Sequence, residues 1–322
     1  MESTPQITVA ICTYNRSSYL RDTLYDLAVQ KTDKKLYEIL VIDNNSSDGT
    51  EAVCDRFRAA NPGHFFKVVK EEKQGLSHAR NRAVAESGTE ILFFIDDDVR
   101  LPDEYVGKAI QFSNSRPQTL AAGGRIEVAF DGLESHPDWI PKPLMPMFGL
   151  HNLGEGSKIY PLNNFPRGGN MMIRKSLFQA FGGFDMTLGR MGDQLLGSEE
   201  KAFFQRIRKN GVELSYWGEL WLTHRIPPHR LEKEYLRRQS VGIGYSEGIR
   251  AVNRLQRIGK YMSELLKLGV SLFLGICHLL RGRLKPALFL LRFRAWVLQG
   301  FYNSGKAEKN DRRQISNNRL SE

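Results

Sequence analysis

Three consecutive aspartates, Asp96, Asp97 and Asp98, directly follow a short apolar segment at residues 91–95. This segment has the length and composition of a buried strand, and Pro102 blocks a regular continuation. Ligands of open α/β sheets bind beyond the carboxyl ends of the strands, so these carboxylates are expected to form a site. Asp96 and Asp98 would face the same side of an extended backbone and could bind Mg²⁺ or Mn²⁺, which in turn binds phosphates. The alternative is an acidic turn that caps the next helix.

Strand and helix signals alternate along the chain before these acids. Apolar runs predict strands at residues 7–11, 38–42 and 66–70, and helical patterns occur at 18–28, 50–60 and 76–87. Such alternation indicates a parallel sheet with helices on its faces. Polar loops follow the strands, and three such loops at one sheet edge would outline a cleft of nucleotide size.

The second half of this region is less regular. Residues 133–166 are rich in proline and glycine, which predicts a long loop or lid over the site. A helical pattern follows at residues 198–210, with Gly211 as its expected C-cap. Glu199 and Glu200 lie in the first turn of that helix, where acids also favour the helix dipole.

Seven motifs occur in order at residues 9–16, 41–50, 75–83, 94–98, 168–174, 182–185 and 197–200. Together they resemble the inverting family 2 glycosyltransferases of GT-A fold. The resemblance extends over residues 7–230 and implies an α/β fold with a Rossmann-like, mostly parallel central sheet flanked by helices. It also implies a catalytic domain at residues 1–230 that moves a sugar from a nucleotide-diphospho-sugar to a hydroxyl group.

The resemblance implies a nucleotide site at the strand ends, formed by Thr13, Tyr14, Asn15, Arg16, Asp43, Arg80, Asp96 and Asp97. The carboxylate of Asp43 could accept the imide N–H of uracil or thymine, and we expect a UDP-sugar as donor. An Asx-turn is the alternative role for Asp43. The planar guanidinium of Arg80 could bind the base or the diphosphate, with a surface ion pair as the alternative.

The metal ligands implied by the resemblance are Asp98, Asp96 and His224, and the cofactor would be Mg²⁺ or Mn²⁺. Such a cation would neutralise the departing nucleoside diphosphate. His224 could instead cap a loop at the end of a strand.

Inverting transfer also needs a base for the acceptor hydroxyl. The resemblance places this base in the pair Glu199–Glu200, and we assign it to Glu200. The chain departs from the family here, because the second acid is usually aspartate. Asn170 and Asp185 would lie on the acceptor side, although Asp185 could form an Asx-turn instead.

The basic character of the chain is concentrated in its C-terminal part. Residues 225–322 contain 20 Lys and Arg against 7 Asp and Glu, whereas the whole chain has a net charge of +10. Two apolar segments with basic residues, 262–280 and 287–301, fall short of the about 20 apolar residues of a bilayer span. They predict a basic amphipathic helical region at 231–302 that lies at a membrane interface, or a helical pair packed on the domain or in a dimer. Residues 303–322 are polar and are expected to be disordered.

Composition also bears on the compartment and the partners. The N-terminal residues lack a secretion signal, and Cys12, Cys54 and Cys277 are too far apart to suggest a disulfide framework or a zinc site. We therefore expect a cytoplasmic enzyme, peripheral on the inner face of the plasma membrane. Its partners would be a lipid-linked or polysaccharide acceptor and an anionic membrane surface. The Leu and Phe content of the basic region favours lipid over nucleic acid.

Two other functions stay open. A nucleotidyltransferase could use the same sheet and acids, but it usually has a glycine-rich phosphate loop where this chain has Thr-Tyr-Asn-Arg at 13–16. A non-catalytic, membrane-associated scaffold could retain the fold, because a fold alone does not make an enzyme. The acids at 96, 98 and 200 argue against the scaffold.

Overall fold

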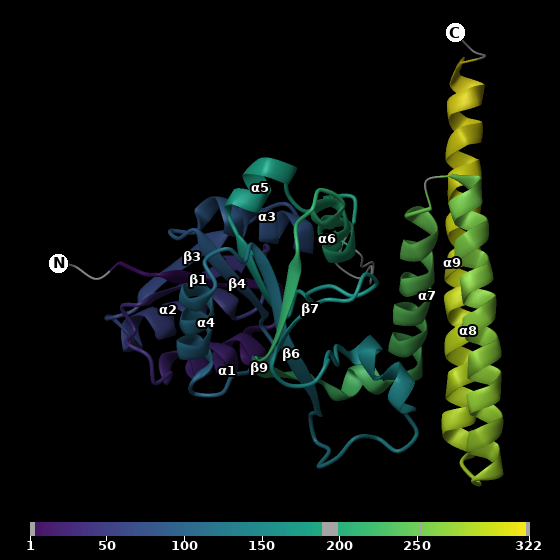
Figure 1. Ribbon diagram of the computed structural model, residues 1–322, viewed down its shortest axis with the longest axis horizontal. Coiled ribbons are helices and arrows are strands. Elements are labelled where there is room, and N and C mark those ends of the chain that lie inside the picture. The colour runs from purple at the N-terminus through teal and green to yellow at the C-terminus, as the bar shows by residue number, and fades with distance from the viewer. Residues whose placement is uncertain (1–3, 189–198, 252, 320–322) are drawn as a thin grey trace. The chain divides into compact units, whose positions relative to one another are not determined.

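A computed structural model describes residues 4–188, 199–251 and 253–319 (Figure 1). These residues belong to two compact units. Of the described residues, the larger unit, called the α/β unit below, comprises 4–131, 146–188 and 199–226. The smaller, called the helical unit, comprises 132–145, 227–251 and 253–319. The segment predicted as a lid at 133–166 is therefore divided between the two units.

Within the described residues, the α/β unit is built on one nine-stranded mixed sheet with the order β3-β2-β1-β4-β8-β6-β9-β5, and β7 pairs with β9. The strands are β1 (Ile7–Thr13), β2 (Tyr37–Asp43), β3 (Phe65–Lys70), β4 (Ile91–Asp96), β5 (Val99–Arg100), β6 (Ala121–Phe130), β7 (Ser157–Ile159), β8 (Asn170–Arg174) and β9 (Leu214–Ile226). The first four neighbours in this order pair in parallel, which confirms the prediction from the alternating pattern. β8 then runs antiparallel to both β4 and β6.

Helices cover both faces of this sheet (Figure 1). One face carries α1 (Ser17–Ala28), α2 (Thr50–Ala60) and α4 (Tyr105–Ser115), and the other carries α3 (Leu76–Glu86), α5 (Ser176–Phe181) and α6 (Glu199–Lys209). In β2, Ile39 and Val41 belong to the first core, whereas Leu40 and Ile42 belong to the second. Strands covered on both faces are apolar throughout, which explains the uninterrupted apolar runs in the sequence.

Several elements were not predicted from the sequence, among them α4, β5, β6 and β8. β8 has the largest consequence, because its pairing with β4 places Asn170 opposite Ile95, directly before the acids. This pairing joins segments far apart in the chain, so local periodicity does not reveal it. The predicted loop at 133–166 also contains a 3₁₀ helix, η1 (Lys142–Phe148), in addition to β7.

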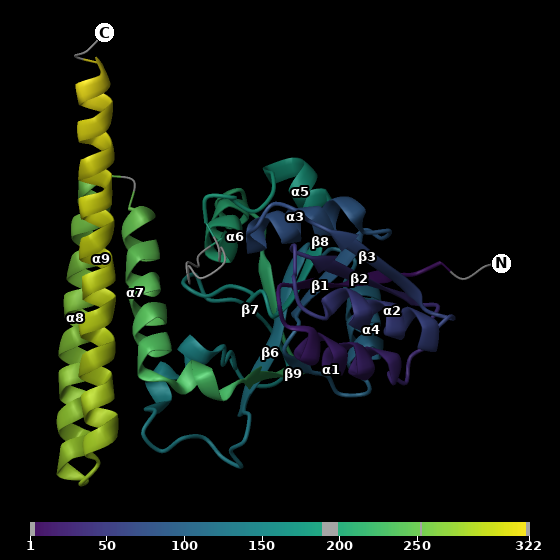
Figure 2. The ribbon, with the colours of Figure 1, turned by 180° about the vertical axis from the view of Figure 1, so that it is seen from behind.

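The helical unit contains three long helices in the part of the chain that is described, α7 (Lys233–Ile249), α8 (Arg254–Leu280) and α9 (Leu284–Arg319), after a short 3₁₀ helix, η2 (Pro228–Leu231) (Figure 2). α7 and α9 pack backbone to backbone. A β-carbon on Gly244 would collide with the backbone of Val297, and one on Gly300 would collide with that of Val241. Small residues at these positions therefore set the distance between the two helices.

α9 continues as a helix through 303–319, where the polar composition predicts disorder. Its packed part extends at least to Ser304, which is buried. The guanidinium of Arg257 on α8 donates to Ser304 Oγ at 3.1 Å. Contacts with α8 thus stabilise α9 beyond the apolar segment predicted at 287–301.

α8 begins at Arg254, before the apolar segment predicted at 262–280. By length and composition alone, this helix could cross a membrane. One side of it is strongly exposed and apolar, with Leu255, Leu266, Phe273 and Leu280 between 66% and 83% exposed. The apolar segment was expected to be too short to cross a membrane. That expectation is wrong as regards length, because the helix is 27 residues long.

Candidate active site

The three aspartates lie where β4 ends and the chain turns into β5. Asp96 is the last residue of β4, and Asp97 and Asp98 form a turn. Thr23 on α1 fixes this turn, because its hydroxyl donates to the carbonyl oxygens of Asp97 and Val99 at 2.8 and 2.9 Å. The backbone is therefore not extended here, and the argument that placed Asp96 and Asp98 on one side of a strand is wrong.

Asp96 and Asp98 nevertheless converge, and His224 joins them. Their ligand atoms all lie within 4.8 Å of one another. β5 pairs antiparallel with β9, which sets Val99 opposite His224 and brings the imidazole to the acids. His224 Nδ1 lies 2.8 Å from the carbonyl oxygen of Phe148, and Nε2 lies 3.2 Å from Asp98 Oδ1. Two carboxylates and one oriented imidazole are a donor set that fits Mn²⁺ or Mg²⁺.

Asp97 contacts the end of β1 and the loop that follows it. Its carboxylate accepts a hydrogen bond from Thr13 Oγ1 at 2.7 Å and pairs with Arg16 Nη1 at 2.9 Å. The same Nη1 lies 2.5 Å from Asp98 Oδ2. Burial raises the pKa of Asp97 to about 6, against the opposing effect of Arg16. Asp97 thus binds both Thr13 and Arg16, and these contacts do not require a nucleotide.

The loop after β1 is tied to the loop after β2. Asn15 has a φ of 51°, and its side-chain oxygen accepts the N–H of Ser47 at 2.7 Å. Asp43 Oδ1 accepts the N–H of Ser46 at 2.9 Å, which is the Asx-type bond considered as the alternative for this residue. The neighbouring Tyr14 is 39% exposed.

Asn44 was not singled out from the sequence, although it joins this loop to the next. It is buried, its amide donates to the carbonyl oxygens of Glu71 and Lys73, and its oxygen accepts the N–H of Gly75. The sequence feature that could have identified Asn44 is its position directly after the strand that ends at Asp43. Asn44 therefore fixes the segment at residues 71–75 to the loop after β2.

Arg80 lies on α3 and points to the start of α6. Its Nη1 lies 2.7 Å from Glu199 Oε1, and its Nη2 lies 2.9 Å from Glu200 Oε1. Arg80 is 3% exposed, and its guanidinium stacks over the ring of Phe184. The pairing is a buried one, so the alternative of a surface ion pair is wrong. Of the two acids, Glu200 is the more accessible, with 20% of its side chain exposed against 5% for Glu199.

Gly168 and Gly169 lie between the two groups of acids. A β-carbon on Gly169 would come within 2.8 Å of Asp96 Oδ2. A β-carbon on Gly168 would collide with Arg80 Nη2 and Glu200 Oε1. One dipeptide is therefore in contact with the candidate metal site on one side and the candidate base on the other.

The two residues predicted on the acceptor side are placed differently. Asn170 is fully buried; its amide donates to the carbonyl oxygens of Arg125 and Leu220, and its oxygen accepts the Tyr105 hydroxyl. It joins three strands and a helix and cannot reach an acceptor, so that prediction is wrong. Asp185 Oδ1 accepts the N–H and the hydroxyl of Thr187, which is the Asx-turn alternative.

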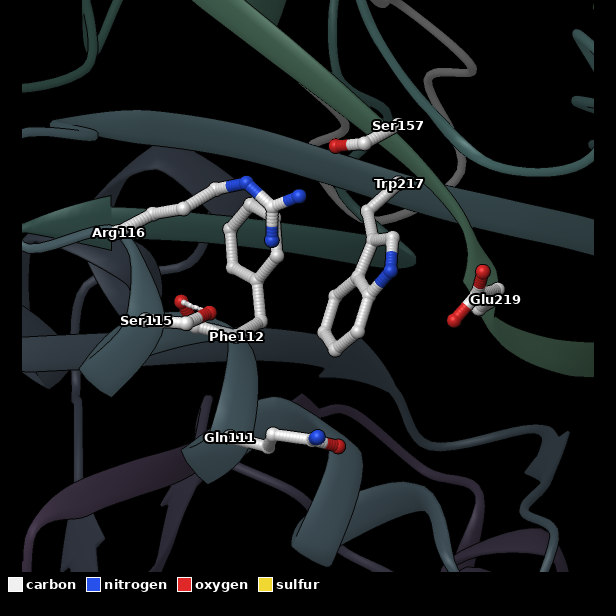
Figure 3. A pocket seen from close by; sticks show the side chains of 7 residues that line it. All are labelled: Gln111, Phe112, Ser115, Arg116, Ser157, Trp217 and Glu219. Atoms are coloured by element: carbon white, nitrogen blue, oxygen red, sulfur yellow. Dashed lines mark hydrogen bonds between the residues drawn. The ribbon is translucent and has the colours of Figure 1, made fainter.

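A separate pocket of about 200 Å³ lies between α4 and β9 (Figure 3). Phe112 and Trp217 stack at its centre with ring centroids 4.3 Å apart, and Arg116 lies over the Phe112 ring. The remaining lining residues are Gln111, Ser115, Ser157 and Glu219. Both rings are buried, and their stacking stabilises the contact of α4 with the sheet.

Comparisons with known proteins agree with this geometry. The family model Glycosyl transferase family 2 matches residues 8–182. The chain is 26% identical over 251 residues to glucosyl-dolichyl phosphate glucuronosyltransferase from Haloferax volcanii, covering 76% of this chain and 77% of that protein. It is 30% identical over 126 residues to glycosyltransferase AglE of the same organism, covering 39% and 41%.

Among solved structures, the mannosyltransferase PcManGT from Pyrobaculum calidifontis, in complex with GDP-Man and Mn²⁺, superposes with a TM-score of 0.61. The sequences are 16% identical, and the superposition covers 94% of this chain and 87% of the other. At this identity the likeness bears on the fold, and it confirms the GT-A fold predicted from the sequence. The chain belongs to glycosyltransferase family 2 and is a glycosyltransferase.

Proposed function

We propose that the enzyme transfers a sugar, with inversion and with the help of a divalent cation, from a UDP-sugar to a hydroxyl of a lipid-linked glycan or a polysaccharide. One observation carries this proposal. Asp96 of the Asp96–Asp98–His224 cluster lies beside the β-carbon position of Gly169, and the carboxylate of Glu200 lies beside that of the neighbouring Gly168. A nucleotide-sugar with its diphosphate on the first group would therefore have its sugar near the second.

The donor half would be held by Asp96, Asp98 and His224. When bound, Mn²⁺ or Mg²⁺ would neutralise the charge that develops on the departing diphosphate. The protein's own contribution is to hold the ligand atoms in place. His224 donates from Nδ1 to the carbonyl oxygen of Phe148, which leaves Nε2 as the ligating nitrogen. Arg16 binds Asp98 Oδ2, which leaves Oδ1 facing His224.

The acceptor half would use Glu200 as general base. Its carboxylate accepts the proton of the acceptor hydroxyl while that oxygen bonds to the anomeric carbon. The bond from this carbon to the diphosphate oxygen breaks on the opposite face, and the nucleoside diphosphate leaves with the bonding electrons. Attack opposite to the leaving group inverts the anomeric centre. A single carboxylate suffices, in contrast to retaining hydrolysis, which requires a nucleophile and an acid.

The nucleoside would lie against the loops that follow β1 and β2. Asp43 Oδ1 already accepts the N–H of Ser46, which orients the carboxylate at this edge. A carboxylate accepts the ring N–H of uracil or thymine, and also that of guanine. The corresponding ring nitrogens of cytosine and adenine are acceptors, so these bases would be disfavoured.

A lipid-linked acceptor places the reaction at a membrane. The name of the Haloferax relative specifies a glucosyl-dolichyl phosphate. In the present chain, the exposed apolar side of α8 would provide membrane contact, together with the basic residues of the helical unit. Glu264 on α8 is buried against Arg294 of α9, and a spanning position would bring this pair into hydrocarbon. We therefore propose peripheral attachment to the cytoplasmic leaflet, with α8 in the interface plane.

Sedimentation with liposomes tests this attachment. The wild-type protein should sediment with anionic vesicles and less with neutral ones, and added salt should weaken binding. Leu266→Gln combined with Phe273→Gln should reduce binding by about tenfold or more, because each side chain would lose apolar burial. Leu162→Gln is the matched control, since Leu162 is 84% exposed on the α/β unit. Equal binding of all forms would overturn the proposal, and resistance to alkaline carbonate would indicate a spanning helix instead.

The activity itself is tested with a panel of nucleotide-sugars. The purified enzyme with Mn²⁺ should release UDP from a UDP-sugar, slowly by hydrolysis and faster with a membrane extract as acceptor. EDTA should abolish the release. Formation of pyrophosphate from a nucleoside triphosphate and a sugar 1-phosphate would indicate the nucleotidyltransferase alternative. Absence of nucleotide binding would indicate the scaffold.

A further inference from the structure

The buried guanidinium of Arg80 joins the two acids at the start of α6. Its Nη1 and Nη2 bind different carboxylates, Glu199 at 2.7 Å and Glu200 at 2.9 Å. A guanidinium presents its donors in a fixed planar fork, so the two distances together determine where Glu200 Oε1 lies. A lysine at this position would supply a charge but no such fork.

We propose that Arg80 is a positioning residue for the base, which it holds through this bridge, and that it does not bind the donor. The proposal deepens the proposed function and rests on Glu200 as the base. Arg80 is 3% exposed, and two of its donors already bind acids of α6. Phe184 covers one face of the guanidinium with its ring centroid 5.6 Å away. A donor base or diphosphate would have to displace these contacts.

The charges around Arg80 support the same role. The pKa of Arg80 is raised because the attraction of Glu200, Glu199 and Asp96 outweighs the opposing effect of burial. The buried charge of Arg80 is thus compensated by the same two acids that it holds in place.

Gly168 is the second part of this arrangement. Its missing side chain leaves room for Arg80 Nη2 and Glu200 Oε1, which a β-carbon would displace. Both atoms are the ends of flexible side chains, so they can move without disturbing the backbone. Gly168→Ala should therefore fold normally but separate the base from its partner. Gly169 contacts Asp96 instead and provides a matched substitution for the other half of the site.

Arg80→Met and Arg80→Lys test the proposal, with UDP and Mn²⁺ affinity measured by titration calorimetry and kcat measured from transfer. For Arg80→Met we expect an unchanged affinity and a kcat lowered about 10²-fold, because the base loses the fork that fixes its position. Arg80→Lys should recover part of kcat. Gly168→Ala should lower kcat at unchanged affinity, and Gly169→Ala should weaken Mn²⁺ binding.

Arg208→Met is the control on α6, the helix of the two acids, since Arg208 binds carbonyl oxygens at residues 160–164 and neither acid. It should leave kcat unchanged. If Arg80→Met does not fold, the double variant Arg80→Met/Glu199→Gln removes the buried unpaired charge and serves in its place. Weakened UDP binding with unchanged kcat, or a wild-type kcat in Arg80→Met, would overturn the positioning role. Full activity of Glu200→Gln would instead overturn the base assignment of the proposed function.

Discussion

His224 and Asp98 face each other across the pairing of two strands, with Nε2 of the imidazole 3.2 Å from Oδ1 of the carboxylate. Each side chain is fixed from behind: His224 Nδ1 by the carbonyl oxygen of Phe148 at 2.8 Å, and Asp98 Oδ2 by Arg16 at 2.5 Å. A ligand atom held in this way needs little reorganisation when a cation binds.

Replacement of His224 by alanine should therefore weaken Mn²⁺ binding by about tenfold or more, because the cluster loses one of its three ligands. Calorimetric titration of Mn²⁺ measures this directly and does not depend on knowing the acceptor. His278→Ala is the control, since His278 lies on α8. Equal Mn²⁺ affinity of His224→Ala and the control would exclude the histidine as a ligand.

The sequence predicted the parallel half of the sheet and the position of the acids but missed how His224 reaches them. Strands β1 to β4 and helices α1 to α3 follow one another along the chain, so their local patterns are sufficient. β8 and β5 pair with strands distant in the sequence, and no short window contains both partners. Prediction therefore placed the acids at the end of a strand, as the structure does, and described the turn at Asp97–Asp98 incorrectly.

Close packing of α7 on α9 gives a prediction for stability. Gly244→Ala should lower the free energy of unfolding by about 1–3 kcal/mol, because the added carbon would lie 2.8 Å from the carbonyl carbon of Val297 and nearer still to its oxygen. Gly269→Ala on α8 is the control, since nothing lies within 4 Å of its β-carbon position. Alanine favours helices there by about 1 kcal/mol. Urea unfolding of the full chain measures both, and equal effects would refute the close contact.

Burial of His151 predicts sensitivity to acid. Desolvation lowers its pKa to about 3, and Arg167 acts in the same direction. Between pH 6.5 and about pH 3, His151 is protonated in the unfolded chain but not in the folded protein. The free energy of unfolding therefore falls as the pH decreases through this range. The loss from this residue should reach about 2–3 kcal/mol at pH 4.5. No loss from this residue is expected above pH 7.

The variant His151→Gln isolates this contribution, since an amide can still bind the Tyr160 hydroxyl that lies 2.8 Å from the imidazole. Urea unfolding at pH 7 and at pH 4.5 should show a smaller loss for the variant than for the wild type. Identical losses would mean that His151 is protonated in the folded protein.

Sequence patterns were less informative about which side chains are available to substrates. Asn170 and Arg80 lie in motifs typical of the family, yet Asn170 is fully buried and Arg80 is bound to two acids. A motif shows that a residue type is required at a position but does not distinguish a ligand contact from an internal one. That distinction depends on burial and on partners brought from other strands and helices, which only the folded chain defines.

The most direct test compares Asp98→Ala with Glu200→Gln for Mn²⁺-dependent UDP binding and for turnover of a UDP-sugar. Asp98→Ala should lose both, because the diphosphate loses a ligand to its cation. Glu200→Gln should bind UDP as the wild type does and turn over about 10²-fold more slowly, because an amide cannot accept the acceptor's proton. If Glu200→Gln turns over normally, or if Asp98→Ala retains Mn²⁺-dependent binding, the division of the site into a metal half and a base half is contradicted.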